Sequence, residues 1–364
     1  MPSSPRAYVA TGGWIVSRNQ DLAWFHGSVL AGLALLACFY VLPGLNNATY
    51  SVGNPAVLIV LAWGIVFDGT HVWATYARTY FVHDATSRAG LPGPACFLWM
   101  LVGPVVAVID HLWFAQDTSL LGHAGLLFRY FLVFAFIWAY WHLIRQHYGL
   151  MRLYARKSGE PAGRLDTAFL WVGSLYPYLR FSLSDAYAAT NLPNLVPIAL
   201  YAVARTALDA SFAVAALVLV AIWLARQRQR PTVFGPKHLL IAVVVGFNML
   251  VFATLDNLIT ITATLTIFHN LQYHRIVWLY ERGHHRVPMG VVPLYFGLGL
   301  LFGLLWYGPR ILGAAIAPSD LERNVLLGLG WGVAFHHYAI DARIWRIRRT
   351  PGLTQLLDAG AHSI

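Results

Sequence analysis

FHHYAIDARIWR, residues 335–346, ends the last long apolar segment of this chain and carries two histidines and a carboxylate. An apolar segment of about 20 residues is long enough to cross the hydrocarbon core of a bilayer. Ionisable side chains inside such a segment cost about 2.5–3.5 kcal/mol each, so they usually serve a function and have partners nearby. This stretch therefore predicts a polar site inside a membrane protein, with its partners on other apolar segments.

The composition of the whole chain supports a membrane location. Of its 364 residues, 58% are hydrophobic and 11% are charged, whereas soluble domains have about 25% charged residues. Basic residues cluster in short loops between apolar segments, not on a soluble face that could bind nucleic acid. Cys38 and Cys96 lie in apolar segments without a CxxC spacing, so the sequence supports neither a disulfide framework nor a zinc knuckle. These features predict an all-α, polytopic membrane helix bundle with no nucleic acid partner.

Ten apolar segments are long enough to be membrane spans. They are residues 27–44, 55–78, 93–115, 125–148, 166–183, 196–225, 238–255, 258–278, 290–312 and 324–345. Every second connection holds most of the 25 Lys and Arg residues, so the positive-inside rule places both termini in the cytoplasm. We expect a single integral-membrane domain over residues 1–364, with cytoplasmic ends at 1–26 and 346–364. The expected location is the bacterial inner (plasma) membrane.

Histidines and aspartates gather at the predicted cytoplasmic ends of four of these spans. Four helices that meet at one depth can build a polyhistidine metal site, and imidazoles with a carboxylate suit non-haem iron or zinc. The aspartates are either ligands or partners that orient the histidines. The candidate metal ligands are Asp68, His71, His142, His269, His274, His336, His337 and Asp341.

Helical spacing predicts which of these side chains face the same way. Residues three or four apart share a face, which groups Asp68 with His71 and His337 with Asp341. Adjacent residues diverge, so we expect only one of His336 and His337 to point into a shared site.

Two further pairs are five residues apart, which is about 140° round a regular helix. His269 and His274 therefore converge only if a π-bulge lies between them, a feature that often marks functional sites. The same condition applies to His142 and His147.

Other polar residues near these positions are candidates for supporting roles. Three arginines directly follow site positions and either pair with an anionic headgroup at a substrate mouth or serve as positive-inside anchors. The supporting or reserve candidates are His147, His83, Gln146, Asn270 and Tyr273, and the mouth candidates are Arg145, Arg275 and Arg343.

The number of spans and the gathering of polar residues on one side give the chain a resemblance to histidine-rich integral-membrane oxygenases. The residues that carry the resemblance are His71, His142, His269, His274, His336, His337 and Asp341. This group of oxygenases includes desaturase-like and hydroxylase-like di-iron enzymes and the membrane-bound carotene-cleaving oxygenases. The resemblance implies a non-haem oxygenase, desaturase or hydroxylase with two iron ions and a lipophilic substrate. Since the chain has no flavin, haem or Fe–S motif of its own, a separate donor protein is expected to supply electrons.

The same residues leave alternatives open. A ceramidase-like membrane zinc hydrolase holds zinc with three histidines and activates water at the fourth position. A transporter uses histidines and aspartates as a proton or metal relay, although such sites usually lie near the membrane midplane on broken helices. Haem between histidines of facing helices is a further alternative.

Overall fold

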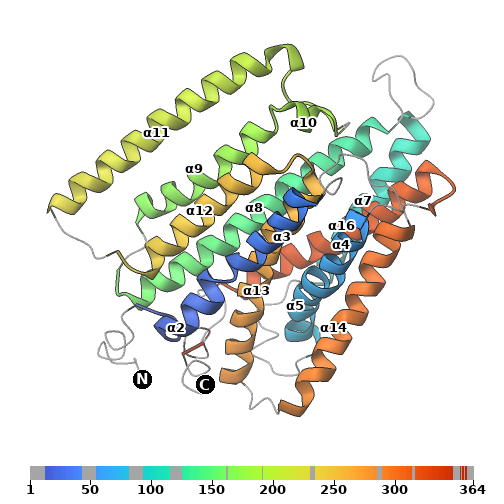
Figure 1. Cartoon of the computed structure of the whole chain (residues 1–364). Helices are drawn as coiled ribbons and strands as arrows, with labels where there is room; N and C mark the ends of the chain where they lie inside the picture. The colour runs from blue at the N-terminus through green and yellow to red at the C-terminus, as the bar shows by residue number, and fades with distance from the viewer. Residues whose placement is uncertain are drawn as a thin grey trace. The chain divides into compact units, whose positions relative to one another are not determined.

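The computed structural model describes residues 13–42, 55–81, 93–114, 125–160, 163–190, 192–229, 234–284, 289–313 and 316–346, and positions 353, 355, 357 and 358. All regular secondary structure in these ranges is helical, which confirms the all-α prediction for this part of the chain (Figure 1). The α-helices are α2 (Arg18–Asp21), α3 (Val29–Val41), α4 (Pro55–Trp63), α5 (Thr70–Tyr80), α7 (Trp99–Ile109), α8 (Leu126–Lys157), α9 (Arg164–Phe181), α10 (Asp185–Ala188), α11 (Tyr201–Gln229), α12 (Pro236–Thr254), α13 (Leu258–His284), α14 (Val292–Tyr307) and α16 (Asp320–Ile344).

Shorter segments with other helical hydrogen bonding extend several of these helices. The π-helical segments are η1 (Leu22–His26), η2 (Gly64–Gly69), η4 (Asp110–Phe114) and η7 (Gly308–Gly313), and the 3₁₀ segments are η3 (Pro94–Leu98), η5 (Ile198–Leu200) and η6 (Met289–Val291). Helices α8 and α13 are regular throughout, so the π-bulges on which two histidine pairs depended do not form there.

Seven helices among the described residues are long and apolar enough to cross a membrane. They are Arg18–Val41, Val57–Tyr80, Pro94–Trp113, Leu126–Lys157, Ile198–Gln229, Pro236–Thr254 and Val292–Gly313. Each overlaps a predicted span. The other three predicted spans also form helices, α9, α13 and α16, but these contain more charged and polar residues. The total of ten spans and the placement of both termini stay predictions.

The chain forms two compact units, each assembled from separate stretches of sequence. Unit 1 comprises Met1–Ala48 and Leu143–Gln272, and unit 2 comprises Thr49–His142 and Tyr273–Ile364. The divisions fall inside α8 and α13, so both of these helices contribute residues to both units. The sequence has no linker and no change of composition at these two points, because both lie inside a helix. It therefore predicts a single domain.

In unit 1, α9 contacts both α11 and α12, and the three helices lie side by side (Figure 1). Some buried polar groups here have partners inside the unit. Asn248 donates to the Ser174 hydroxyl at 3.2 Å. The Lys237 ammonium lies 3.0 Å from Glu160 and 2.9 Å from Asp166.

Unit 2 is packed through glycines that let helix backbones approach closely, as in many membrane proteins. Helix α16 packs against α7, where a Cβ atom on Gly103 or Gly328 would overlap the backbone of the other glycine. Helix α14 packs against η2 and α5, where a Cβ on Gly303 would overlap the backbone of Ile65. These contacts set the positions of α5 and α16, which carry four of the eight candidate ligands.

Candidate metal centre

Four buried side chains of unit 2 meet in one place. His71 comes from α5, His142 from α8, and His337 and Asp341 from α16. Each offers one ligand atom, and these atoms all lie within 4.8 Å of one another. In the part of the chain that the structure describes, no other group of three or more His, Cys, Asp and Glu side chains is placed to hold a metal ion.

The spacing of the ligand atoms suits a single metal ion. Nε2 of His71 lies 2.9 Å from Nε2 of His337, which in turn lies 3.5 Å from Oδ2 of Asp341. Nε2 of His142 lies 3.9 Å from the same Oδ2. Ligand atoms about 2.0–2.1 Å from a tetrahedral zinc are separated from one another by about 3.4 Å. The three measured distances lie on either side of that value, so the four residues fit a bound ion.

The local sequence explains how α16 contributes two ligands. His337 and Asp341 are four residues apart in a regular helix and therefore share a face, as their spacing predicts. Between them, the ring of Tyr338 stacks on the ring of His142, with centroids 4.2 Å apart. This stacking holds the His142 imidazole beside α16.

Hydroxyl groups fix the carboxylate of Asp341. Tyr273 and Thr75 both donate to Oδ1, at 2.8 Å and 3.0 Å. The indole N–H of Trp345 donates to the Tyr273 hydroxyl oxygen at 3.2 Å. Because Oδ1 accepts these bonds, Oδ2 is the oxygen that faces His142 and His337. Partners of this kind orient metal ligands and commonly change metal affinity by about 10–100-fold.

Tyr273 was predicted as a supporting residue, whereas Thr75 and Trp345 were not identified as partners of the site. The sequence does contain a signal for Thr75, because it lies four residues after His71 on the same face of α5. Trp345 lies beyond the end of α16, where helical spacing no longer predicts its direction.

The neighbouring histidine of α16 has different contacts. The Nδ1 atom of His336 is hydrogen-bonded to the Tyr76 hydroxyl at 2.9 Å, and Nε2 to the Tyr80 hydroxyl at 3.1 Å. His336 therefore lies outside the four-residue group, in agreement with the expectation that only one of the adjacent histidines enters the site.

Two further candidates of unit 2 contact other side chains. Nε2 of His274 is hydrogen-bonded to Oγ1 of Thr70 at 3.1 Å. The carboxylate of Asp68, in η2, accepts a hydrogen bond from the Tyr307 hydroxyl at 2.6 Å. The four-residue group includes neither of them.

Several candidates belong to unit 1, where they form separate contacts. The rings of His147 and His269 lie 6.0 Å apart at an edge-to-face angle. Asn270 is buried, and Gln146 is half-buried. The sequence could not separate these residues from the unit 2 ligands, because His147 follows His142 within one helix and His269 precedes His274 within another.

The arginines predicted at a substrate mouth differ in exposure. Arg145 and Arg343 are exposed, whereas Arg275 is buried. The reserve candidate His83 lies outside the described residues.

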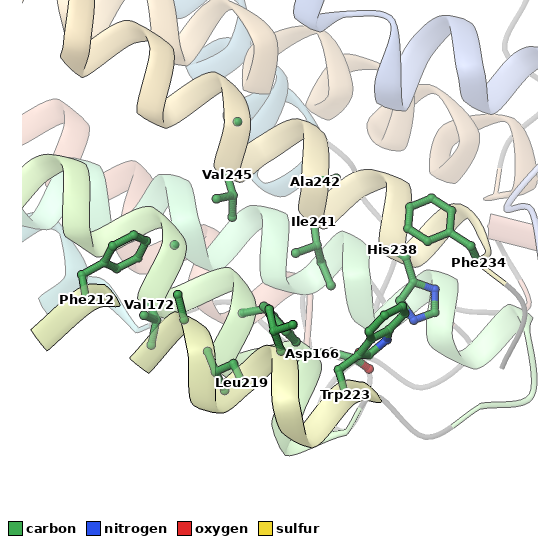
Figure 2. A pocket seen from close by; sticks show the side chains of 15 residues that line it. Asp166, Val172, Phe212, Leu219, Trp223, Phe234, His238, Ile241, Ala242 and Val245 are labelled. Atoms are coloured by element: carbon green, nitrogen blue, oxygen red, sulfur yellow. The ribbon is translucent and has the colours of Figure 1, made fainter. Parts of the chain in front are cut away.

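An apolar cavity of about 450 Å³ lies elsewhere, within unit 1, between α9, α11 and α12. Figure 2 shows Trp223, Phe234 and His238 at one end of the cavity and Phe212 at the other. Valine and leucine side chains line the walls between these ends. The lining offers few metal-ligand atoms, so it is a less suitable place for metal chemistry than the His/Asp group.

No family model matches the chain, and comparisons with curated proteins and with solved structures also find no match.

Proposed function

We propose that this protein is a membrane-embedded, metal-dependent oxidoreductase that acts on a lipophilic substrate. His71, His142, His337 and Asp341 would hold one non-haem iron ion. The observation that carries the proposal is the convergence of these four buried side chains, from three helices, to within 4.8 Å. The resemblance to membrane oxygenases implies two irons, whereas we propose one, because the described residues gather ligand atoms for a single ion.

The donor set supports iron-dependent oxidation. Histidines with a carboxylate are the ligands of many non-haem iron oxygenases, which keep open positions for oxygen and substrate. The four residues would hold the ion, and an iron ion that accepts further ligands would have positions left for that purpose. When bound, iron supplies the activation of O₂, with electrons from a separate donor protein.

The protein's own residues have three tasks in this proposal. The imidazoles and the Asp341 carboxylate hold the ion, and the negative charge of the carboxylate offsets part of its positive charge. Tyr273 and Thr75 keep the carboxylate in one orientation. Burial of all four ligands excludes bulk water, which protects reactive species from side reactions.

The position of the ligands supports a lipophilic substrate. His71 and His142 belong to helices that are long and apolar enough to span a membrane. A molecule that reaches them from the bilayer must itself be soluble in lipid, since uncompensated polar groups are costly in hydrocarbon.

The test is an oxygen-dependent assay with the purified protein. Protein loaded with Fe(II) is incubated with bacterial lipid extract, ascorbate and O₂, and lipid masses are compared before and after. We expect the gain of one oxygen atom or the loss of two hydrogen atoms in a lipid class. Asp341→Asn should abolish this change, and Asp209→Asn, which alters a half-exposed carboxylate paired with Arg180, should retain it. Equal turnover by both variants would contradict the proposal.

One observation favours a second candidate, a zinc hydrolase. Three imidazoles, from His71, His142 and His337, are the ligand number of many hydrolytic zinc sites, in which the fourth position holds water. Asp341 would then accept a proton from that water instead of binding the ion. This candidate predicts bound zinc and cleavage of lipid amides or esters without O₂.

A further inference from the structure

Arg78 of α5 is buried, and two aromatic rings pack against its guanidinium. Its side chain is 4% exposed. The central carbon, Cζ, lies 3.8 Å from the centre of the Tyr280 ring and 3.7 Å from the centre of the Trp345 ring. Rings in these positions attract the cation, but they accept no ordinary hydrogen bonds in the plane of the guanidinium.

That edge is not saturated by the protein. The Nη1 atom of Arg78 is buried and has no hydrogen-bond partner among the described residues. A guanidinium carries five N–H donors in one plane, and buried donors in proteins are nearly always paired. Carboxylate and phosphate groups fit such an edge best, because two of their oxygens accept two parallel N–H bonds.

Arg78 lies beside the candidate metal centre. It is seven residues after His71 and three after Thr75 in one regular helix, so the three residues share a face of α5. Trp345, whose ring contacts the guanidinium, also donates to the Tyr273 hydroxyl, and that hydroxyl donates to Asp341. A group bound by Arg78 would therefore be anchored next to the residues that orient a metal ligand.

We propose that Arg78 binds the oxyanion headgroup of an amphipathic lipid and that this lipid is the substrate. The inference rests on the proposed function for its statement about the substrate. Arg78 lies in the last turn of the candidate span Val57–Tyr80. A ligand that lies along the span and ends at this position would combine an apolar chain with an anionic group at its end.

The test measures lipid binding by native mass spectrometry of the detergent-purified full chain. The probes are oleic acid, dioleoyl phosphatidic acid and uncharged oleyl alcohol. Arg78→Gln removes the charge and the fork of donors, and Arg78→Lys keeps the charge alone. Arg346→Gln is the matched control, because this exposed arginine directly follows Trp345 and carries the same charge. Metal content is measured on the same samples.

We expect Arg78→Gln to weaken binding of one anionic probe by about 10- to 100-fold, the usual effect of losing a charge-assisted hydrogen bond. Arg78→Lys should weaken it less, and Arg346→Gln should leave it within a factor of about two. Binding of oleyl alcohol should not change. The probe that depends on Arg78 identifies the headgroup as a carboxylate or a phosphate.

Two results overturn the proposal. One is unchanged binding of both anionic probes to Arg78→Gln, or to Arg78→Lys if the glutamine variant does not fold. The other is an equal loss of oleyl alcohol binding, which would assign Arg78 to packing alone. If the protein holds no metal but its lipid binding depends on Arg78, the anion site stands and the proposed function is refuted. If the protein holds metal but binds the anionic probes equally well without Arg78, the proposed function stands and the anion site is refuted.

Discussion

The two adjacent histidines of α16 have the same side chain but different surroundings. Nε2 of His337 lies 2.9 Å from His71 and 3.5 Å from Asp341. Both ring nitrogens of His336 are hydrogen-bonded to tyrosines instead. Substitutions at these two adjacent positions should disturb expression and membrane insertion to a similar extent. A difference in metal content between the two variants would therefore report on metal binding itself.

His337→Ala should lower metal affinity by more than about 100-fold, since it removes a ligand and not merely a partner of one. His336→Gln should keep the metal, because glutamine can still bond to the tyrosine hydroxyls. Metal content after dialysis, measured on protein purified from the membrane fraction, checks both expectations. Equal metal content in the two variants would mean that His337 is not a ligand.

The hydroxyl of Tyr273 should affect the metal through Asp341. Tyr273→Phe removes the 2.8 Å hydrogen bond to Oδ1 and leaves that of Thr75, so metal affinity should fall by about 10–100-fold in competition with a chelator. Tyr295→Phe is the control, because Tyr295 packs in the same apolar cluster and its hydroxyl has no partner among the described residues. A similar affinity for both variants would argue against a role of Tyr273 in orienting the carboxylate.

At the scale of elements, the position of α14 against η2 depends on the absence of a side chain at Gly303. Gly303→Ala would drive a Cβ into the backbone of Ile65, and overpacking of this kind costs about 1–3 kcal/mol. Gly297, on the same helix, has nothing within 4 Å of such an atom. Alanine there should be neutral or stabilise by up to about 1 kcal/mol, the difference in helix propensity.

Melting in detergent, followed by circular dichroism, compares the two glycine variants. The expected order of apparent melting temperature is Gly303→Ala below wild type, with Gly297→Ala equal to or above wild type. A Gly303→Ala variant as stable as Gly297→Ala would show that α14 and η2 are not held at this distance.

The sequence predicts the helices well because long apolar segments leave few alternatives in a membrane. The first boundary differs: the span was expected to begin at residue 27, and the helix begins at Arg18. Ser17 caps it, and the buried Asp21 carboxylate accepts hydrogen bonds from the backbone N–H groups of Ile15 and Val16. Composition counts Asp21 as a charge outside the membrane, whereas these local bonds let it lie inside a helix.

The ligand set is predictable only in part. The i, i+4 spacing of His337 and Asp341 identifies two ligands on one helix face. His142 was predicted as a ligand and His147 as a reserve candidate, but helical spacing alone does not separate them, because the choice depends on how α8 is rotated about its axis. Helix rotation is set by contacts with other helices, and these involve residues distant in sequence.

At the scale of the whole molecule, the distribution of basic residues predicts that both termini lie in the cytoplasm. Fluorescent protein, which fluoresces only in the cytoplasm, should be active when fused to either end, and alkaline phosphatase, which requires the periplasm, should be inactive at both. Phosphatase activity at one terminus would require an odd number of spans. In that case the C-terminal ends of α5 and α8 would no longer lie on the same side of the membrane as both termini.

The candidate metal centre and Arg78 both belong to unit 2, although this unit is built from two stretches of sequence that are far apart. Its formation therefore requires residues 49–142 and 273–364 to be present together. Function is expected to depend on the intact chain and not on either half.

Metal content per chain, measured by plasma mass spectrometry on detergent-purified protein beside an absorption spectrum, tests the central claim most directly. The four ligands predict about one iron ion per chain and no Soret band, with the metal lost in His337→Ala. An equal amount of zinc would keep the site and favour the hydrolase. No stoichiometric metal in protein that has folded in the membrane would contradict a metal centre at His71, His142, His337 and Asp341.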